Sequence, residues 1–232
     1  AIRVFSMIVA VLFFAVVVRA GEKSGKPVDL ELVLAIDMSS TADARDFELQ
    51  MRGFADAFRH PDVRAAVYNV GPEGIAVAMV QWSNTKTQEL AMDWTLVTDE
   101  ASLAALADKI ETTPRFVPGG STAIHSAMRF SIDRILDNGY AGRRKIIDIS
   151  ADGGAAYGPR PRRDRDAAIA LGITVNGLVI LEEDPSLDQY FKANVIGGPG
   201  SFVLTVSGYE DFASAMRKKL VLEIADASAR RR

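Results

Sequence analysis

The amino-acid sequence predicts an α/β fold: a doubly wound, mostly parallel sheet with one antiparallel edge strand and helices on both faces. Leu32–Ile36 is a run of five consecutive apolar residues, typical of a strand buried on both faces. Apolar runs of this kind alternate with amphipathic stretches of ten or more residues, the order of elements in doubly wound sheets. With 232 residues, 48% of them hydrophobic, the chain is long enough for one sizeable core and short for two.

The first half of the domain is expected to supply the edge of the sheet. Ala42–Arg59 carries Phe and Met at helical spacing and predicts a helix, which Asp43 would cap and His60-Pro61 would end. The segment Val63–Val70 is ambiguous. Gly74–Trp82 is mostly apolar and predicts an interior strand, and Gln88–Trp94 predicts an edge strand antiparallel to it.

The second half continues the alternation with three further strands. The predicted strands are Arg144–Ser150, Ile173–Ile180 and Ser201–Val206. The predicted helices are Thr98–Glu111, Thr122–Asn138, Arg162–Leu171, Leu187–Val195 and Tyr209–Ile224. A loop rich in Pro and Gly, Thr113–Gly120, leads into the second of these helices.

The N-terminal segment predicts a hydrophobic helix ahead of the domain. Val4–Val18 contains one polar residue, Ser6, and is flanked by Arg3 and Arg19. This pattern fits a signal peptide cleaved after Ala20, and residues 1–20 are also close to the length of a single transmembrane anchor. Residues 21–27 are expected to form a linker, 28–225 the folded domain and 226–232 a basic tail. Either interpretation of the segment predicts an exported domain, periplasmic or anchored on the periplasmic side.

Composition excludes several kinds of site. The formal net charge of −3 argues against a general nucleic-acid binder. The absence of cysteine excludes disulfides, zinc–thiolate sites and thiol catalysis. Because the two histidines lie in different segments, a multi-histidine metal site cannot form within one chain.

Polar side chains follow the first strand at the point where its apolar run stops. Asp37, Ser39 and Thr41 alternate, so an extended chain would point them the same way. Ligands of open parallel sheets bind outside the carboxyl ends of the strands. Carboxylate and hydroxyl oxygens there suit a hard divalent cation.

These residues carry a resemblance to a known family. Asp37-Met-Ser-Ser-Thr41 resembles the Asp-x-Ser-x-Ser opening of von Willebrand factor A (vWA) domains, with Thr in place of the last Ser. The metal-ion-dependent adhesion site (MIDAS) of that family also needs a Thr in a later glycine-bearing loop and an Asp at the end of a later strand. Gly119-Gly-Ser-Thr122 and Ile146–Gly153, which contains Asp152, match these two motifs in the expected order. Within this family, the sequence of the chain is most similar to a bacterial exported subgroup of unassigned function.

The resemblance implies a vWA fold and a metal site made of Asp37, Ser39, Thr41, Thr122 and Asp152. The three hydroxyls would hold Mg²⁺ (or Mn²⁺ or Ca²⁺) directly, and the two carboxylates would hold it through waters. Such an ion is underneutralised and would accept a Glu or Asp of another protein. The implied function is therefore non-enzymatic, metal-dependent protein–protein binding at the bacterial cell envelope.

Two other functions stay open at this point. The chain could be a structural subunit of a larger membrane complex, anchored through residues 1–20, with a vestigial metal site. It could also be a metal-dependent phosphatase or other hydrolase. That function has little support, because Asp37-Met-Ser39 lacks the second Asp of the Asp-x-Asp phosphatase pattern and no Ser–His pairing is visible.

Further polar residues have simpler interpretations. Asp148 lies in an apolar strand and needs a buried partner, for which Asn176 is a candidate. His125 is expected to be a neighbouring hydrogen-bonding or surface group rather than an acid/base. The run Arg160 to Arg165, with four arginines, is expected to be a solvated helix entry, with steering of an acidic partner as the alternative.

Overall fold

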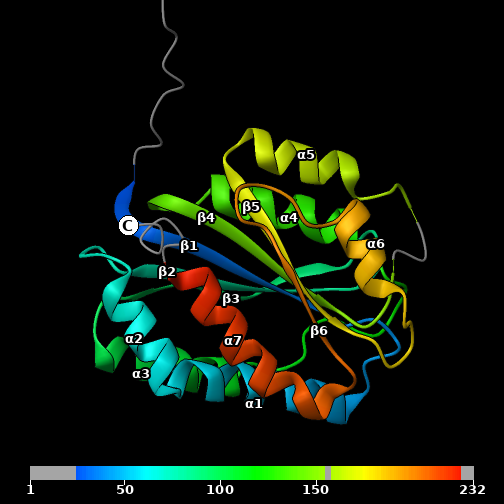
Figure 1. Cartoon of the computed structure of the whole chain (residues 1–232), viewed down its shortest axis with the longest axis horizontal. Helices are drawn as coiled ribbons and strands as arrows, with labels where there is room; N and C mark the ends of the chain where they lie inside the picture. The colour runs from blue at the N-terminus through cyan, green and yellow to red at the C-terminus, as the bar shows by residue number, and fades with distance from the viewer. Residues whose placement is uncertain (1–24, 155–157, 226–232) are drawn as a thin grey trace, which may run out of the picture.

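Six strands and seven α-helices alternate along residues 25–154 and 158–225, the part of the chain that the computed structural model describes (Figure 1). The strands are β1 (Lys26–Asp37), β2 (Ile75–Trp82), β3 (Gln88–Val97), β4 (Tyr140–Ala151), β5 (Ile173–Ile180) and β6 (Val203–Val206). The helices are α1 (Ala44–Arg59), α2 (Pro61–Asn69), α3 (Glu100–Glu111), α4 (Ile124–Leu136), α5 (Arg162–Ala170), α6 (Leu187–Asn194) and α7 (Phe212–Ile224), with the 3-10 turn η1 (Tyr209–Asp211) before α7.

The strands form one sheet in the order β3-β2-β1-β4-β5-β6. Only β3 is antiparallel to its neighbour, so the predicted fold class and the antiparallel edge strand are both confirmed. The strand order reverses at the centre, because the chain moves outward from β1 to β3 and then returns to place β4 on the other side of β1. A ligand crevice is expected at this switch point, outside the carboxyl ends of β1 and β4.

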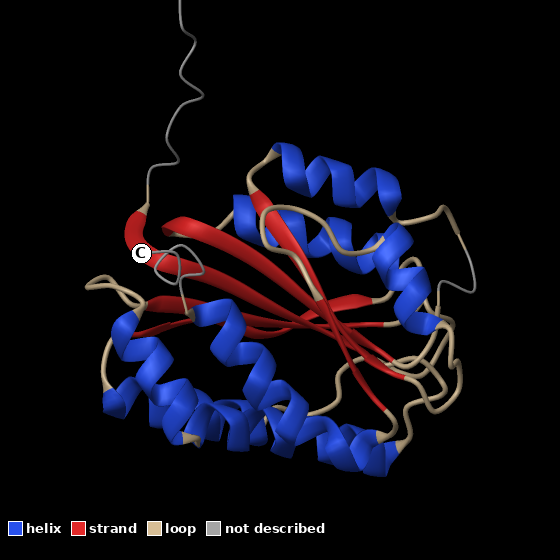
Figure 2. Cartoon of the chain, in the orientation of Figure 1, coloured by secondary structure: helices blue, strands red, loops and turns tan. Residues whose placement is uncertain are grey.

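Helices cover both faces of the sheet (Figures 1 and 2). Helices α1, α2, α3 and α7 lie on one face, and α4, α5 and α6 lie on the other. Strand β1 sends Leu30, Leu32 and Leu34 into the first core and Val33 and Ala35 into the second. Burial on both faces explains why this strand is a continuous apolar run rather than an alternating one.

Two element boundaries differ from the sequence-based expectation. Val63–Val70 proves to be most of helix α2, which starts at Pro61. His60 ends α1, and its side chain also accepts a hydrogen bond from the Asp62 amide at the start of α2. Because Pro has no N–H to lose at a first helical position, it starts a helix as readily as it ends one. Strand β1 begins at Lys26, inside the range 21–27 expected to be a linker.

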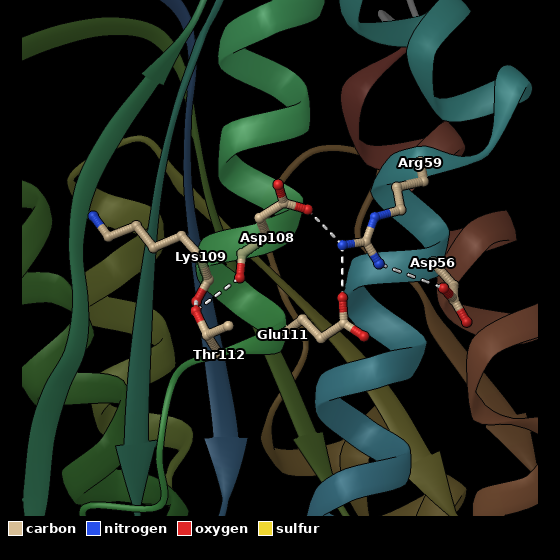
Figure 3. Close-up of polar contacts among 6 residues, drawn as sticks. All are labelled: Asp56, Arg59, Asp108, Lys109, Glu111 and Thr112. Atoms are coloured by element: carbon tan, nitrogen blue, oxygen red, sulfur yellow. Dashed lines mark hydrogen bonds and ion pairs between the residues drawn. The ribbon is translucent and has the colours of Figure 1, made fainter.

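A polar cluster joins the ends of α1 and α3 on the outer surface (Figure 3). The Arg59 guanidinium donates to Asp108 and Glu111, each at 2.6 Å, and lies 3.8 Å from Asp56. Arg59 is the last residue of α1, whereas the carboxyl end of β1 leads into the first turn of α1. The cluster therefore sits about 24 Å along the helix from the β1 end, given 1.5 Å per residue.

The predicted hydrophobic N-terminal helix and the basic tail lie outside the described residues. Within residues 25–154 and 158–225, no helix combines the length and the apolar character that crossing a membrane requires.

Candidate metal centre

The five residues that the sequence singles out come from three loops around the switch point. Asp37 is the last residue of β1, and Asp152 follows directly after the end of β4. Thr122 stands two residues before α4. The parallel pairing of β1 with β4 brings the first two loops to the same edge of the sheet.

Hydrogen bonds connect four of these residues in a chain. The Ser39 amide donates to Asp37 Oδ1 at 2.8 Å, and the Ser39 and Thr41 hydroxyls lie 2.9 Å apart. Thr41 Oγ1 then donates to Asp152 Oδ1 at 2.7 Å, which joins the first motif to the third. Helix α1 is capped by Asp43, as its position predicts, so Asp37 has no capping role.

The loop before α4 completes the group. Its Gly120 carbonyl accepts from the Ser40 amide at 2.9 Å, which ties it to the loop after β1. Thr122 is 7% exposed, and its Oγ1 lies 3.5 Å from the point where a Cβ on Gly153 would stand. Thr122 therefore faces the loop that carries Asp152.

Two buried carboxylates lie close to each other in this site. Asp37 and Asp152 are each 1% exposed, and Asp37 Oδ2 has no hydrogen-bond partner. Burial raises the pKa of Asp37 well above its usual range, and the Asp152 carboxylate raises it further. Tyr209 donates to Asp152 Oδ2 at 2.9 Å, and its own pKa is raised by burial and by that carboxylate. Such a pair of negative charges is costly without a counter-ion.

The donor set fits a hard divalent cation. It combines three hydroxyls with two carboxylates, one of which has a free buried oxygen. Oxygen donors with few carboxylates suit Mg²⁺, which keeps several of its waters. No cluster of three or more His, Cys, Asp and Glu side chains suited to a metal occurs in residues 25–154 and 158–225. The candidate donor set is therefore rich in hydroxyls rather than in carboxylates or imidazoles.

Arg115 is a positioning residue that the sequence did not single out. Its guanidinium donates to the carbonyls of Met38 and Ala42, each at 2.9 Å, and to that of Val117 at 3.2 Å. It therefore fixes both ends of the loop that presents Ser39 and Thr41. A lone Arg in a loop rich in Pro and Gly gives no periodic signal, so sequence reasoning had nothing with which to find it.

An acidic pocket of about 230 Å³ adjoins Thr41 and Asp152. Apart from Tyr209 and Arg45, its other lining residues are all carboxylates. These are Asp43, Asp46, Glu182, Glu183 and Glu210. Such a rim attracts cations to the site and favours basic groups beside it.

Asp148 belongs to a different network, and its predicted partner is wrong. Its carboxylate lies 2.6 Å from Lys219 Nζ. Asn176 does neighbour Asp148 in the sheet, but its amide donates instead to Glu223 at 2.9 Å. The partner of Asp148 comes from helix α7, whose packing the strand pattern does not predict.

The other candidates have structural roles. His125 is 7% exposed and lies close against Gly158. A Cβ added to Gly158 would lie only 2.4 Å from Cε1 of His125. Burial lowers the pKa of His125. Arg162 and Arg165 donate to the Ala193 carbonyl at the end of α6, so these two arginines of the run are engaged within the fold.

Solved structures share this fold at low sequence identity. Proximal thread matrix protein 1 from the mussel byssus, in a form with a zinc-occupied MIDAS motif, is 16% identical with a TM-score of 0.60, over 86% of this chain and 48% of that chain. A von Willebrand factor type A protein from Catenulispora acidiphila is 17% identical with a TM-score of 0.59, over 83% and 42%. The vWF domain of the type V pili tip protein Mfa5 from Porphyromonas gingivalis is 13% identical with a TM-score of 0.57, over 83% and 94%.

The similarity establishes the vWA fold that the motifs predict. The chain spans about half the length of the mussel structures it matches, 49% and 48% in two of them. No curated protein matches the chain. A family model covers residues 27–228, nearly all of the described chain. This chain therefore belongs to the family described as "Protein of unknown function (DUF1194)", and it has a vWA fold.

Proposed function

We propose that this domain is a non-enzymatic protein-binding module whose binding depends on a divalent cation held by Asp37, Ser39, Thr41, Thr122 and Asp152. The observation that carries the proposal is the orphaned Oδ2 of Asp37, buried where the three motifs converge beside a second buried carboxylate. A cation, Mg²⁺ or another divalent ion, would compensate both charges. When bound, it supplies an open position that a carboxylate of another protein fills.

The carboxylates that line the acidic pocket, which form an acidic rim around the site, limit the kinds of protein that could bind there. A bare acidic surface would be repelled by Glu182, Glu183 and Glu210 around the site. The partner is therefore a protein that presents one Glu or Asp surrounded by basic side chains. The charge of the rim also steers that partner toward the site, an effect that falls as salt rises.

Relatives of the same fold support a role at the cell envelope. They include the pilus adhesin SpaC from Lactobacillus rhamnosus GG, an aerotolerance-related membrane protein from Bacteroides fragilis and the pili tip protein Mfa5. We infer that this domain is exported and works in the periplasm or on its membrane surface. Its partners there are other envelope proteins, with no nucleic acid involved.

Two measurements on the purified full chain test the proposal. Calorimetry with MgCl₂ or MnCl₂ after chelation is expected to show one ion per chain and no binding to Asp37→Ala. Envelope proteins retained on the immobilised chain in Mg²⁺ should be released by chelator and should not bind Thr122→Ala. Ser121→Ala, which removes the neighbouring hydroxyl, is the matched control and should behave like wild type. Metal binding that survives Asp37→Ala would refute the site.

A further inference from the structure

Three charged side chains are buried together between the sheet and α7, away from the cation site. Lys219 is 0% exposed, Glu223 1% and Asp148 2%. Lys219 and Glu223 are one turn apart on α7, which lies on the face of the sheet that it shares with α1, α2 and α3 (Figure 1). Asp148 reaches them from β4. Burying three ionised groups costs several kcal/mol per ion unless each is well compensated, so their grouping calls for an explanation.

The amine is in contact with both carboxyl groups. Lys219 Nζ lies 2.6 Å from Asp148 Oδ1 and also donates to Glu223 Oε1. Asn176 donates to that same oxygen of Glu223 at 2.9 Å, and the Phe202 ring centroid lies 5.5 Å from Nζ. The second oxygens of Asp148 and Glu223 are buried without a hydrogen-bond partner. The group therefore holds an amine, a carboxyl carbon and a second carboxyl, all of them buried.

The proton count of the group allows a neutral, reactive form. Burial and the neighbouring Asp148 carboxylate together raise the pKa of Glu223 to about 7, although Lys219 and Asn176 act in the opposite direction. Burial also raises the pKa of Asp148. The raised carboxyl pKa values favour a form in which one carboxylic acid and one carboxylate lie beside the Lys219 ammonium. Transfer of one proton from Lys219 to Asp148 leaves a free amine between two carboxylic acids, without changing the net charge of the buried group.

We propose that Lys219 and Asp148 condense to an intramolecular amide bond that joins α7 covalently to β4. The lone pair of Nζ attacks Cγ of Asp148 and forms the N–C bond. The C–O bond to the carboxyl hydroxyl breaks, and one water leaves. Glu223 donates its proton to the departing hydroxyl and takes one from the nitrogen, so it ends unchanged. No oxidant or other reactant is needed.

The fold holds the reacting atoms in place. Nζ already lies 2.6 Å from Oδ1 of the carboxyl group that it would attack, so the two reacting groups are in contact before the reaction. Arg144, also on β4, donates to the carbonyls of Glu223 and Ile224 and so fixes the end of α7 against the strand. Exclusion of water then protects the amide from hydrolysis.

Peptide mapping of the purified, folded full chain tests the proposal. After incubation at neutral pH and digestion, the peptides that contain Lys219 and Asp148 are expected as one cross-linked species, lighter by one water than their sum. Asp148→Asn should give the same cross-link with loss of ammonia in place of water. Lys219→Arg, which keeps the charge, and Glu223→Gln, which keeps the shape, should both give two separate peptides.

Wild-type peptides recovered only in their unlinked form would overturn the proposal. So would a loss of water that maps to a residue other than these two. Neither result depends on a variant, so a variant that fails to fold does not affect the decision. A cross-link that forms equally in Glu223→Gln would remove Glu223 from the mechanism and refute the step as written.

Discussion

Replacing Asp37 by Asn should stabilise the metal-free domain and abolish its response to metal. Asn keeps an oxygen for the Ser39 amide and removes the charge that faces Asp152. An unsatisfied buried group costs about 1–3 kcal/mol, and more when it is charged, so we take this range for the charge penalty that Asn removes. For a domain of this size each kcal/mol moves Tm by about 2–4 °C, so Asp37→Asn should raise Tm in chelator by roughly 2–12 °C.

The wild-type chain, in contrast, should gain stability when the metal is added. A cation at about 100 times its Kd stabilises the form that binds it by about 2.7 kcal/mol, which corresponds to roughly 5–11 °C in Tm. Asp37→Asn should show no such gain. Differential scanning fluorimetry of both chains, in chelator and in Mg²⁺, measures all four values.

A second buried aspartate on the same strand serves as the control. Asp29 is 3% exposed, and it is paired with Arg143 at 3.0 Å and with the Glu73 amide at 2.7 Å. Asp29→Asn should therefore lower Tm and keep the full response to metal. The reasoning is refuted if Asp37→Asn melts below wild type in chelator and still gains stability from Mg²⁺.

Three further predictions concern other parts of the fold. Arg115→Lys cannot keep all three carbonyl contacts, and calorimetry should show metal affinity lower by about 10–100-fold, whereas Arg59→Lys should leave it unchanged. In the chain without the Lys219–Asp148 amide, the folded Glu223 carboxyl keeps a proton that the unfolded chain releases between its ordinary pKa of 4.5 and about 7, so stability should fall by up to about 3 kcal/mol as pH rises through this window. Urea unfolding at several pH values should show this dependence of stability on pH in the wild type and not in Glu223→Gln. An unchanged dependence in Glu223→Gln would mean that another group causes it. Gly177→Ala would place a Cβ 2.6 Å from the Phe191 ring and should cost about 1–3 kcal/mol in urea unfolding, with native-like stability as the contrary result.

The elements were predictable where the hydrophobic pattern is strong. The apolar run of β1 and the alternation after it determine a sheet whose carboxyl ends meet. For that reason Asp37 and Thr41 could be placed at a carboxyl edge from the pattern, whereas Asp152 was added by the resemblance to vWA domains. The shorter helix α2 could not be predicted from the sequence, because Pro61 is equally a stop and a start signal for a helix.

Contacts that depend on helix packing were not predictable. Sheet adjacency pointed to Asn176 as the partner of Asp148, but the partner is Lys219 of α7. Lysine is almost never fully buried, so a sequence gives no reason to place one under a sheet. The role of Arg115 was not predictable for a related reason: it depends on where a loop turns back, and no periodic pattern in the sequence indicates that.

The strand order also bears on how the protein is made. The hydrogen bond from Thr41 to Asp152 joins residues 111 positions apart, and β1 stays unpaired on one side until β4 arrives. Pairing over such a separation closes a long loop, which slows folding. A nascent or truncated chain that ends before β4 therefore lacks Asp152, the only one of the five candidate site residues that follows that strand. Under the proposed function, such a chain would not yet capture a partner.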